Sequence, residues 1–173
     1  MLAMHRILAS ETVGEVGKEV LVKGWVQARR DHGKLIFIDL RDRTGLLQVV
    51  FNPKVSEKAH QAAMALRSEY VIAVTGVIRE RPKNLINPKL VTGTVEIEAK
   101  DLEILAKAET LPFDMGSEAL HLELPTLLDH RSLTLRHPKV AAIFKVQETI
   151  AQSFRKKLAS EGFTEIFVPT IVP

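Results

Sequence analysis

The chain has 173 residues, no cysteine and one tryptophan, and its 24 Lys and Arg against 21 Asp and Glu give a net charge of +3. A hydrophobic share of 46% and a charged share of 26% are typical of a globular protein and exclude a disordered or collagen-like chain. The lack of cysteine excludes a disulfide framework, and no apolar run approaches the roughly 18 residues of a membrane span, so we expect a cytoplasmic protein.

The first predicted strand runs from Glu19 to about Arg30, where apolar and polar residues alternate as in a strand with one buried face. Its core side is expected to hold Val20, Val22, Val26 and Ala28. The segment 31–34 then predicts a tight turn, because Gly33 can adopt a positive φ.

A second strand is predicted at 35–41 and a third at 46–51, with a turn at 43–45 between them. The expected core residues of the second strand are Ile36, Ile38 and Leu40. Three strands joined by short turns form a meander.

Residues 56–66 predict a helix with Ser56 as its N-cap. Two further strands are predicted at 69–79 and 94–105, separated by a long loop rich in Pro and Asn. This order predicts a mainly β fold, a five-stranded OB-fold barrel with a helix between strands 3 and 4, although unrelated small barrels share the order.

Residues 106–138 show no sustained period and contain several prolines, which indicates a hinge. From Pro138 to Gly162 an amphipathic helix is predicted, and a short strand follows at 163–168. Apolar residues recur in the helix at spacings of three and four: Ile143, Val146, Ile150, Phe154 and Leu158. The expected domains are 1–106, 107–137 and 138–173.

Phe37 must point outward if its neighbours on the second strand point inward. Single-stranded nucleic acid is one partner for such a ring, because a stacked base contributes about 1–3 kcal/mol and OB folds bind oligonucleotides on this face. Packing under the helix or against another domain is the alternative. Gln48 is expected on the same face, where its amide can read a base edge.

Basic residues surround the expected face. The positive excess lies in residues 1–106, with 16 Lys and Arg against 13 Asp and Glu, whereas residues 107–173 hold eight of each. The clustered residues that would hold phosphates or stack on bases are Arg29, Arg30, Lys34, Arg43, Arg79, Arg81 and Lys83. A solvated surface with uneven charge explains any one of them equally well.

Known catalytic motifs are missing from the sequence, including phosphate-binding glycine loops and zinc-protease or hydrolase signatures. The six histidines lack metal-ligand spacing, so no metal site is expected. Asp39 and Asp42 are better explained by ion pairs that support a turn than by a catalytic pair. The residues alone therefore predict a binding protein.

Several separated strings are shared with a known family, in the same order and spacing. They are Gly24-Trp25-Val26, Arg29-Arg30-Asp31, the run 36–43, Gln48-Val49, the run 67–71, Val74-Thr75-Gly76, Asn87-Pro88 and Thr92-Gly93. Together they resemble the N-terminal anticodon-binding domain of bacterial aspartyl-tRNA synthetases. Near the end, Gly162-Phe163, Ile166 and Pro169 resemble motif 1 of class II synthetases.

The resemblance implies roles for individual residues. Phe37 matches the aromatic residue that stacks on the central anticodon base, and Gln48 matches the residue that reads this base. Arg30 and Arg81 match contacts to the anticodon stem and loop. Glu96 matches a residue near the first anticodon base.

Three positions near the implied anticodon pocket indicate a sub-type. His32, Leu85 and Leu90 stand where synthetases that charge only tRNA-Asp tend to have Leu, Asn and Met. The resemblance therefore implies the non-discriminating form, which also aspartylates tRNA-Asn and depends on an amidotransferase to convert the product. Drift in an exposed loop is the alternative.

The motif 1 resemblance implies a homodimer in the parent enzyme, with Ile143, Ile150, Phe163 and Pro169 at the interface. The family's hinge usually reads R-Y-L-D-L-R-R-P, and residues 131–138 depart from it. The sequence ends before motif 2, the aspartate-binding residues and motif 3. We therefore expect the first helix and strand of a truncated class II α+β catalytic domain, which is inactive by itself.

The implied parent is an aspartate–tRNA ligase that activates aspartate with ATP and Mg and transfers it to tRNA; this chain is expected to bind neither cofactor, and no membrane. A stand-alone OB-fold protein that binds single-stranded nucleic acid is an alternative, but it has no use for a motif 1 helix and strand. An asparaginyl- or lysyl-tRNA synthetase is a third possibility, and the string Phe-Ile-Asp-Leu-Arg-Asp-Arg fits the aspartyl type best.

Overall fold

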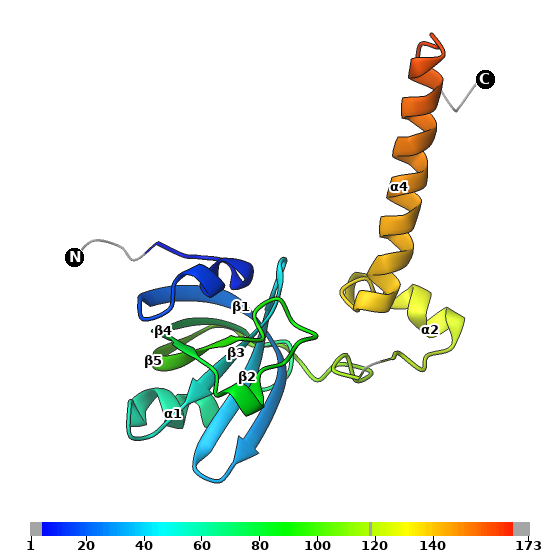
Figure 1. Ribbon diagram of the computed structural model, residues 1–173. Coiled ribbons are helices and arrows are strands. Elements are labelled where there is room, and N and C mark those ends of the chain that lie inside the picture. Colours follow the sequence, from blue (N-terminus) through cyan, green and yellow to red (C-terminus); the bar gives the residue numbers. More distant parts are fainter. Residues whose placement is uncertain (1–4, 118, 168–173) are drawn as a thin grey trace. The chain divides into compact units, whose positions relative to one another are not determined.

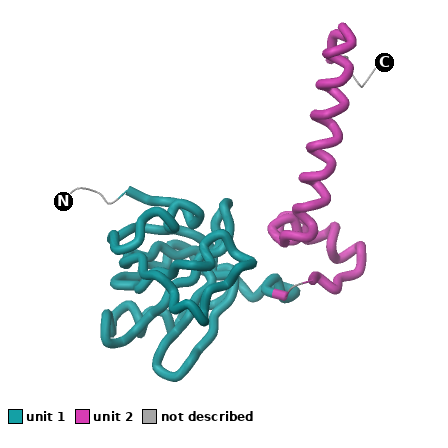
Figure 2. The backbone as a smooth tube through the Cα atoms, viewed as in Figure 1, with its two compact units in different colours: residues 1–116 teal, residues 117–173 magenta. Residues whose placement is uncertain are grey.

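The computed structural model describes residues 5–117 and 119–167. The chain divides into two compact units, 1–116 and 117–173 (Figure 2). Residues 107–116, which the sequence places at the start of the hinge, therefore group with the first unit. No helix in the described ranges is long and apolar enough to cross a membrane.

The first unit is a closed five-stranded barrel (Figure 1). Its strands are β1 (Glu19–His32), β2 (Leu35–Asp42), β3 (Gly45–Phe51), β4 (Val71–Glu80) and β5 (Val95–Ala106). They pair in the order β1-β2-β3-β5-β4, β4 pairs with β1, and only β3 and β5 run parallel. Helix α1 (Glu57–Met64) follows β3, and Ser56 caps it as predicted. The predicted OB-fold order is confirmed.

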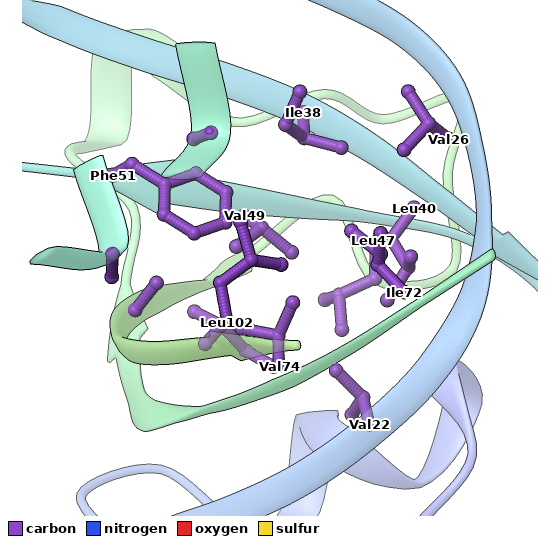
Figure 3. Close-up of a cluster of buried hydrophobic side chains, with 14 of the residues drawn as sticks. Val22, Val26, Ile38, Leu40, Leu47, Val49, Phe51, Ile72, Val74 and Leu102 are labelled. Carbon is purple, nitrogen blue, oxygen red and sulfur yellow. The ribbon is translucent and has the colours of Figure 1, made fainter. Parts of the chain in front are cut away.

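Inward-facing side chains from all five strands fill the barrel (Figure 3). On β2, the predicted core residues Ile36, Ile38 and Leu40 are at most 4% exposed. Ala59 of α1 joins Phe51 in the same buried cluster. Because burial of apolar surface is the main stabilising contribution, this packing fixes the helix against the barrel.

A β-bulge in β1 changes the face of the residues that follow it. Val26 pairs with Leu40 of β2. Ala28 pairs with Asp39, the next residue of β2, so Gln27 is an extra residue. Since paired residues of antiparallel strands point to the same side, Ala28 lies on the outer side. The prediction that Ala28 faces the core is wrong, because simple alternation does not reveal an inserted residue.

A short 3-10 helix, η1 (Ala9–Gly14), precedes the barrel and was not predicted. The backbone N–H of Ala9 donates to Oδ2 of Asp42 at 2.8 Å. The other oxygen, Oδ1, accepts from the backbone N–H of Thr44 at 2.7 Å and from its hydroxyl at 2.6 Å. Asp42 thus supports the turn between β2 and β3 and attaches the N-terminal segment to it.

The second unit contains α2 (Leu124–Asp129), α3 (Arg131–Thr134) and α4 (Pro138–Ser160). The sequence analysis predicts no helix between residues 106 and 138, and α2 and α3 correct this. Both helices are too short to show a helical period. Pro125, which the sequence reads as a chain break, lies in the first turn of α2, where its missing N–H is tolerated.

Helix α4 begins at Pro138, as predicted. The buried His137 is its N-cap, since Nδ1 accepts from the backbone N–H of Lys139 at 3.3 Å. The opposite ring nitrogen lies 3.1 Å from the carbonyl oxygen of Ser117. At the other end Gly162 has a φ of 87° and ends the helix, also as predicted.

The strand predicted at 163–168 is wrong over residues 163–167, which have no regular structure. A strand is stabilised by ladder hydrogen bonds to a neighbour, and no other described segment pairs with these residues. Val168 lies outside the described residues.

Candidate nucleic-acid interface

Neighbouring registers on the outer side of β1, β2 and β3 bring predicted site residues together. Arg30 pairs with Phe37 across β1 and β2, and Asp39 pairs with Gln48 across β2 and β3. Phe37, Asp39 and Gln48 are half-buried and alternate with buried residues, so they point away from the core. Arg30 lies on the same side because it pairs with Phe37. Phe37 and Gln48 therefore share one open face, hereafter the outer face, as expected from the alternation.

Arg30 is held on the outer face by Asp39. Its Nη1 and Nη2 donate to the two carboxylate oxygens at 2.8 and 2.7 Å. The bulge in β1 places Arg30 on this side of the sheet, opposite Phe37. Just over half of the Arg30 side chain is exposed, so its planar guanidinium can still stack on a base or hydrogen-bond with it.

Glu96 of β5 orients the amide of Gln48. Nε2 of Gln48 donates to Oε2 of Glu96 at 2.8 Å. The amide oxygen of Gln48 is thereby directed away from Glu96 and can accept a hydrogen bond from a ligand. The assignment of the amide atoms follows from this network, because a carboxylate accepts only.

Arg81 lies next to Glu96, and its side chain is 7% exposed. Its Nε is 3.5 Å from Oε2 of Glu96, an ion-pair distance, yet within the described residues this buried atom has no hydrogen-bond partner. Nη1 donates to the carbonyl oxygen of Leu85 at 3.5 Å. In this arrangement Arg81 neutralises Glu96 and touches the loop that follows β4. Arg79 pairs instead with Glu98, at 3.1 Å.

The loop 82–93 is anchored beside the outer face. The hydroxyl of Thr92 donates to the carbonyl oxygen of Leu46 on β3. A Cβ at position 93 would lie 1.8 Å from the carbonyl oxygen of Asn87, so only Gly93 permits this close approach. Leu85, at the end of η2 (Lys83–Leu85), is 60% exposed, and Leu90 is half-buried.

The structure does not bring Arg29, His32 and Lys34 to Phe37. Arg29 pairs in register with Ile38, and its guanidinium donates to Asp31 at 2.8 and 3.0 Å. These hydrogen bonds from Arg29 lower the pKa of Asp31. His32 and Lys34 are exposed at the turn between β1 and β2.

Arg41 forms a cluster that the sequence analysis did not find. Its Nη2 donates to both carboxylate oxygens of Glu69 at 2.8 Å, and its Nη1 donates to Oε1 of Gln27. Nε2 of Gln27 donates in turn to the carbonyl oxygen of Met115 at 3.1 Å. The guanidinium also lies 5.9 Å from the centre of the Trp25 ring. Alternation marks Arg41 as outward, but it cannot indicate partners from distant segments.

In the second unit, apolar side chains on α4 are exposed. Ile143 and Ile150, both predicted at a dimer interface, are 64% exposed, and Phe163 is 67% exposed. We call Ile143, Val146, Ile150 and Phe154 the apolar stripe. Pro169 lies outside the described residues. Among the described residues, no group of three or more His, Cys, Asp or Glu could hold a metal ion.

Two families match separate parts of the chain. The family described as OB-fold nucleic acid binding domain matches residues 20–105, and the family described as tRNA synthetases class II (D, K and N) matches residues 123–173. The first match coincides with the barrel. The second favours a synthetase over a stand-alone OB-fold protein.

Curated relatives are similar over most of the chain. It is 49% identical over 157 residues to the aspartate–tRNA(Asp/Asn) ligase of Thermodesulfovibrio yellowstonii, with 91% of this chain and 26% of that protein covered. It is 44% identical over 156 residues to the aspartate–tRNA ligase of Bacillus licheniformis, with 90% and 26% covered. The chain thus spans about a quarter of the length of these relatives.

Solved structures are similar as well. The asparaginyl-tRNA synthetase of Pyrococcus horikoshii gives a TM-score of 0.77 at 29% identity, over 99% of this chain and 39% of that one. The aspartyl-tRNA synthetase of Entamoeba histolytica gives 0.82 at 23% identity, over 99% and 40%, and supports the fold alone. The chain belongs to the bacterial aspartyl-tRNA synthetase family, with its OB-fold anticodon domain and the start of its class II synthetase domain.

Proposed function

We propose that the outer face of the barrel reads the anticodon loop of tRNA for an aspartate–tRNA ligase. The observation that carries this proposal is the arrangement of Arg30, Phe37 and Gln48 in neighbouring registers, with Glu96 orienting the amide of Gln48. An aromatic ring beside a planar cation and an oriented amide is suited to an unstacked RNA base.

The proposed recognition divides between the side chains. Phe37 stacks on a base, and the amide oxygen of Gln48 accepts a hydrogen bond from its edge. Arg30 supplies a guanidinium next to the ring, positioned by Asp39. Arg81 acts through Glu96, because its side chain is buried and paired with that carboxylate.

The carboxylate partners on this surface affect how phosphates are bound. Arg29, Arg30, Arg79 and Arg81 each have an acidic partner within ion-pair distance. A phosphate that binds one of them must displace a carboxylate or share the guanidinium with it. We therefore propose that base contacts contribute more on this face than the number of arginines suggests.

For tRNA specificity, we propose the non-discriminating form, which serves tRNA-Asp and tRNA-Asn. His32, Leu85 and Leu90 support it by residue type, and the relative with 49% identity is named a ligase for both tRNAs. The exposure of Leu85 leaves its side chain available to RNA.

The activity of the whole enzyme belongs to the proposal as well, because the chain spans about a quarter of its relatives. In that proposal ATP and Mg serve the parent enzyme, and no residue of this chain is assigned to either. The parent is a cytoplasmic homodimer, and the apolar stripe of α4 lies in its interface. A neighbouring hollow of about 600 Å³, lined by Phe154, Leu158 and Phe163, extends this apolar surface.

The test is binding of a fluorescently labelled RNA hairpin, the anticodon stem-loop of tRNA-Asp, measured by anisotropy. Phe37→Ala should weaken binding by about 1–3 kcal/mol. Phe167→Ala removes a ring that is 91% exposed in the other unit and should leave affinity unchanged. Equal affinities of wild type and Phe37→Ala would refute the stacking role.

A second comparison uses the hairpin of tRNA-Asn. The non-discriminating form predicts similar affinities for the two hairpins. Leu85→Asn should shift the preference toward the tRNA-Asp hairpin, whereas a strong preference in the wild-type chain would contradict the proposed sub-type.

A further inference from the structure

A hollow lies beside β1 and the turn after β2, and the sequence analysis singled out only Arg43 among the residues that line it. It has a volume of about 540 Å³. The residues that line it are His5, Arg6, Leu8, Glu11, Trp25 and Arg43. It thus combines an indole ring with two guanidinium groups, and Glu11 is its one acidic residue.

Hydrogen bonds fix the walls of this hollow. The N-terminal segment runs beside β1, since Ile7 donates its backbone N–H to the carbonyl oxygen of Leu21 at 3.0 Å. Nη2 of Arg6 donates to the carbonyl oxygen of Lys23 at 3.1 Å. The side chain of Glu11 accepts from the backbone N–H of Leu8 at 2.6 Å. The carboxylate is therefore already engaged with the backbone.

The aromatic and basic groups are preorganised in different ways. Trp25 is half-buried, and the Arg41 guanidinium lies 5.9 Å from its ring centre, which fixes the ring on the outer side of β1. Arg43 is exposed at the turn after β2, and in the described part of the chain its guanidinium makes no hydrogen bond or ion pair. It differs in this respect from Arg30, which Asp39 already engages.

The hollow lies on the same side of β1 and β2 as the outer face, farther along these strands. Trp25 pairs with Arg41, and Arg41 follows Phe37 by four residues on the same side of β2. At about 3.3 Å per residue this separation is about 13 Å. One OB fold engages roughly 4–16 nucleotides of a single strand, so a strand that covers Phe37 can extend as far as Trp25.

We propose that this hollow is a second nucleotide subsite for the same RNA strand. A base packs against the ring of Trp25, and Arg43 and Arg6 bind the phosphate next to it. The proposal rests on the proposed anticodon-binding function, because the strand must first occupy the outer face.

Trp25 is the only tryptophan of the chain, so its fluorescence reports directly on the subsite. The experiment titrates the 173-residue chain with the anticodon stem-loop hairpin and follows tryptophan fluorescence together with the anisotropy of a labelled hairpin. Quenching that saturates at the same RNA concentration as the anisotropy supports the subsite.

Variants test each group separately. Trp25→Leu should weaken hairpin binding by about fivefold or more, and Trp25→Phe should keep most of the affinity. Arg43→Gln should weaken binding and reduce the magnitude of the salt slope by about 0.7, the value for one phosphate of a single strand. Lys54→Gln removes one positive charge outside the hollow and serves as the control.

The outcomes separate the subsite from the anticodon proposal. Unquenched Trp25 at saturating RNA, or Arg43→Gln with the affinity of Lys54→Gln, overturns the subsite. Binding that is sensitive to Phe37→Ala but not to Trp25→Leu refutes the subsite alone. Failure of the wild-type chain to bind the hairpin refutes both. Because Trp25→Leu removes a half-buried ring, its fold is checked by thermal unfolding, and the exposed Arg43 variant gives an independent result.

Discussion

Glu69 receives two hydrogen bonds from Arg41, each 2.8 Å long, although its own backbone has a φ of 63°. A non-glycine residue in this left-handed region is uncommon and costs conformational free energy. Only 3% of the Glu69 side chain and 14% of the Arg41 side chain are exposed. The pair joins β2 to the turn before β4, and we expect it to dominate the polar contribution to stability of the barrel.

Glu69→Ala should therefore destabilise the first unit by about 3–5 kcal/mol, because it leaves the buried guanidinium of Arg41 without its counter-charge. Urea unfolding followed by circular dichroism measures the change. A loss below about 1 kcal/mol would mean that solvent or Gln27 compensates Arg41 in the variant.

The Arg30–Asp39 pair has equally short hydrogen bonds but is accessible to solvent, since 55% of the Arg30 side chain is exposed. Asp39→Ala should cost only about 0.2–1 kcal/mol in the same unfolding experiment. The two substitutions form a matched comparison of a buried and an exposed ion pair. Similar losses in both would show that burial does not control their contributions.

Glu96→Ala should reduce discrimination at the base that Gln48 contacts, because the amide of Gln48 then loses the acceptor that fixes its orientation. We expect discrimination between a matched hairpin and one with that base changed to fall by about 1–3 kcal/mol. Anisotropy with both hairpins measures it. The Gln48→Ala variant provides the comparison, and full discrimination in Glu96→Ala would contradict the positioning role.

Asp31 should titrate below the usual range of an aspartate, because Arg29 donates two hydrogen bonds to its charged form. A depressed pKa stabilises the folded state above the unfolded pKa, and this contribution is lost as the pH falls through the folded value. NMR titration of the carboxyl carbon measures the pKa. Arg29→Ala should raise it, and an unchanged value would exclude Arg29 as the cause.

The apolar stripe predicts self-association of the chain, since four large apolar side chains on α4 are at least 60% exposed. Ile150→Glu should shift sedimentation toward the monomer without changing the free energy of unfolding of the barrel. Lys145→Glu changes an exposed charge on the same helix and serves as its control. A concentration-independent monomer in the wild-type chain would contradict the prediction.

Local patterns predicted the strands, α1 and α4, because each contains enough residues to show its period. On β2, the alternation placed Ile38 inside and Phe37 outside, as the structure has them. Helix α2 covers Leu124–Asp129 and shows no such period. The strand expected at 163–168 failed over its described residues because a strand requires a partner in space as well as alternation in sequence.

The chemistry of the outer face was only partly predictable. Composition and alternation indicated Phe37 and Gln48, because the side of a strand on which a residue lies follows from the local sequence pattern. Arg81 is paired with Glu96 of β5, and the network of Arg41 depends on Glu69 and Met115. These contacts join segments that are far apart in sequence, so residue type suggested a phosphate contact for Arg81 and gave no role for Arg41.

The bulge at Gln27 determines which arginine lies beside Phe37 on the outer face. If Gln27 paired with Asp39 and the bulge were lost, Arg29 would pair with Phe37 and Arg30 would turn to the other side, although every side chain of the proposed site would remain in the sequence. Homologues of the same length that lack the bulge would therefore present a different arginine beside Phe37. Structural register, rather than aligned residue identity, is the sound basis for transferring the site between them.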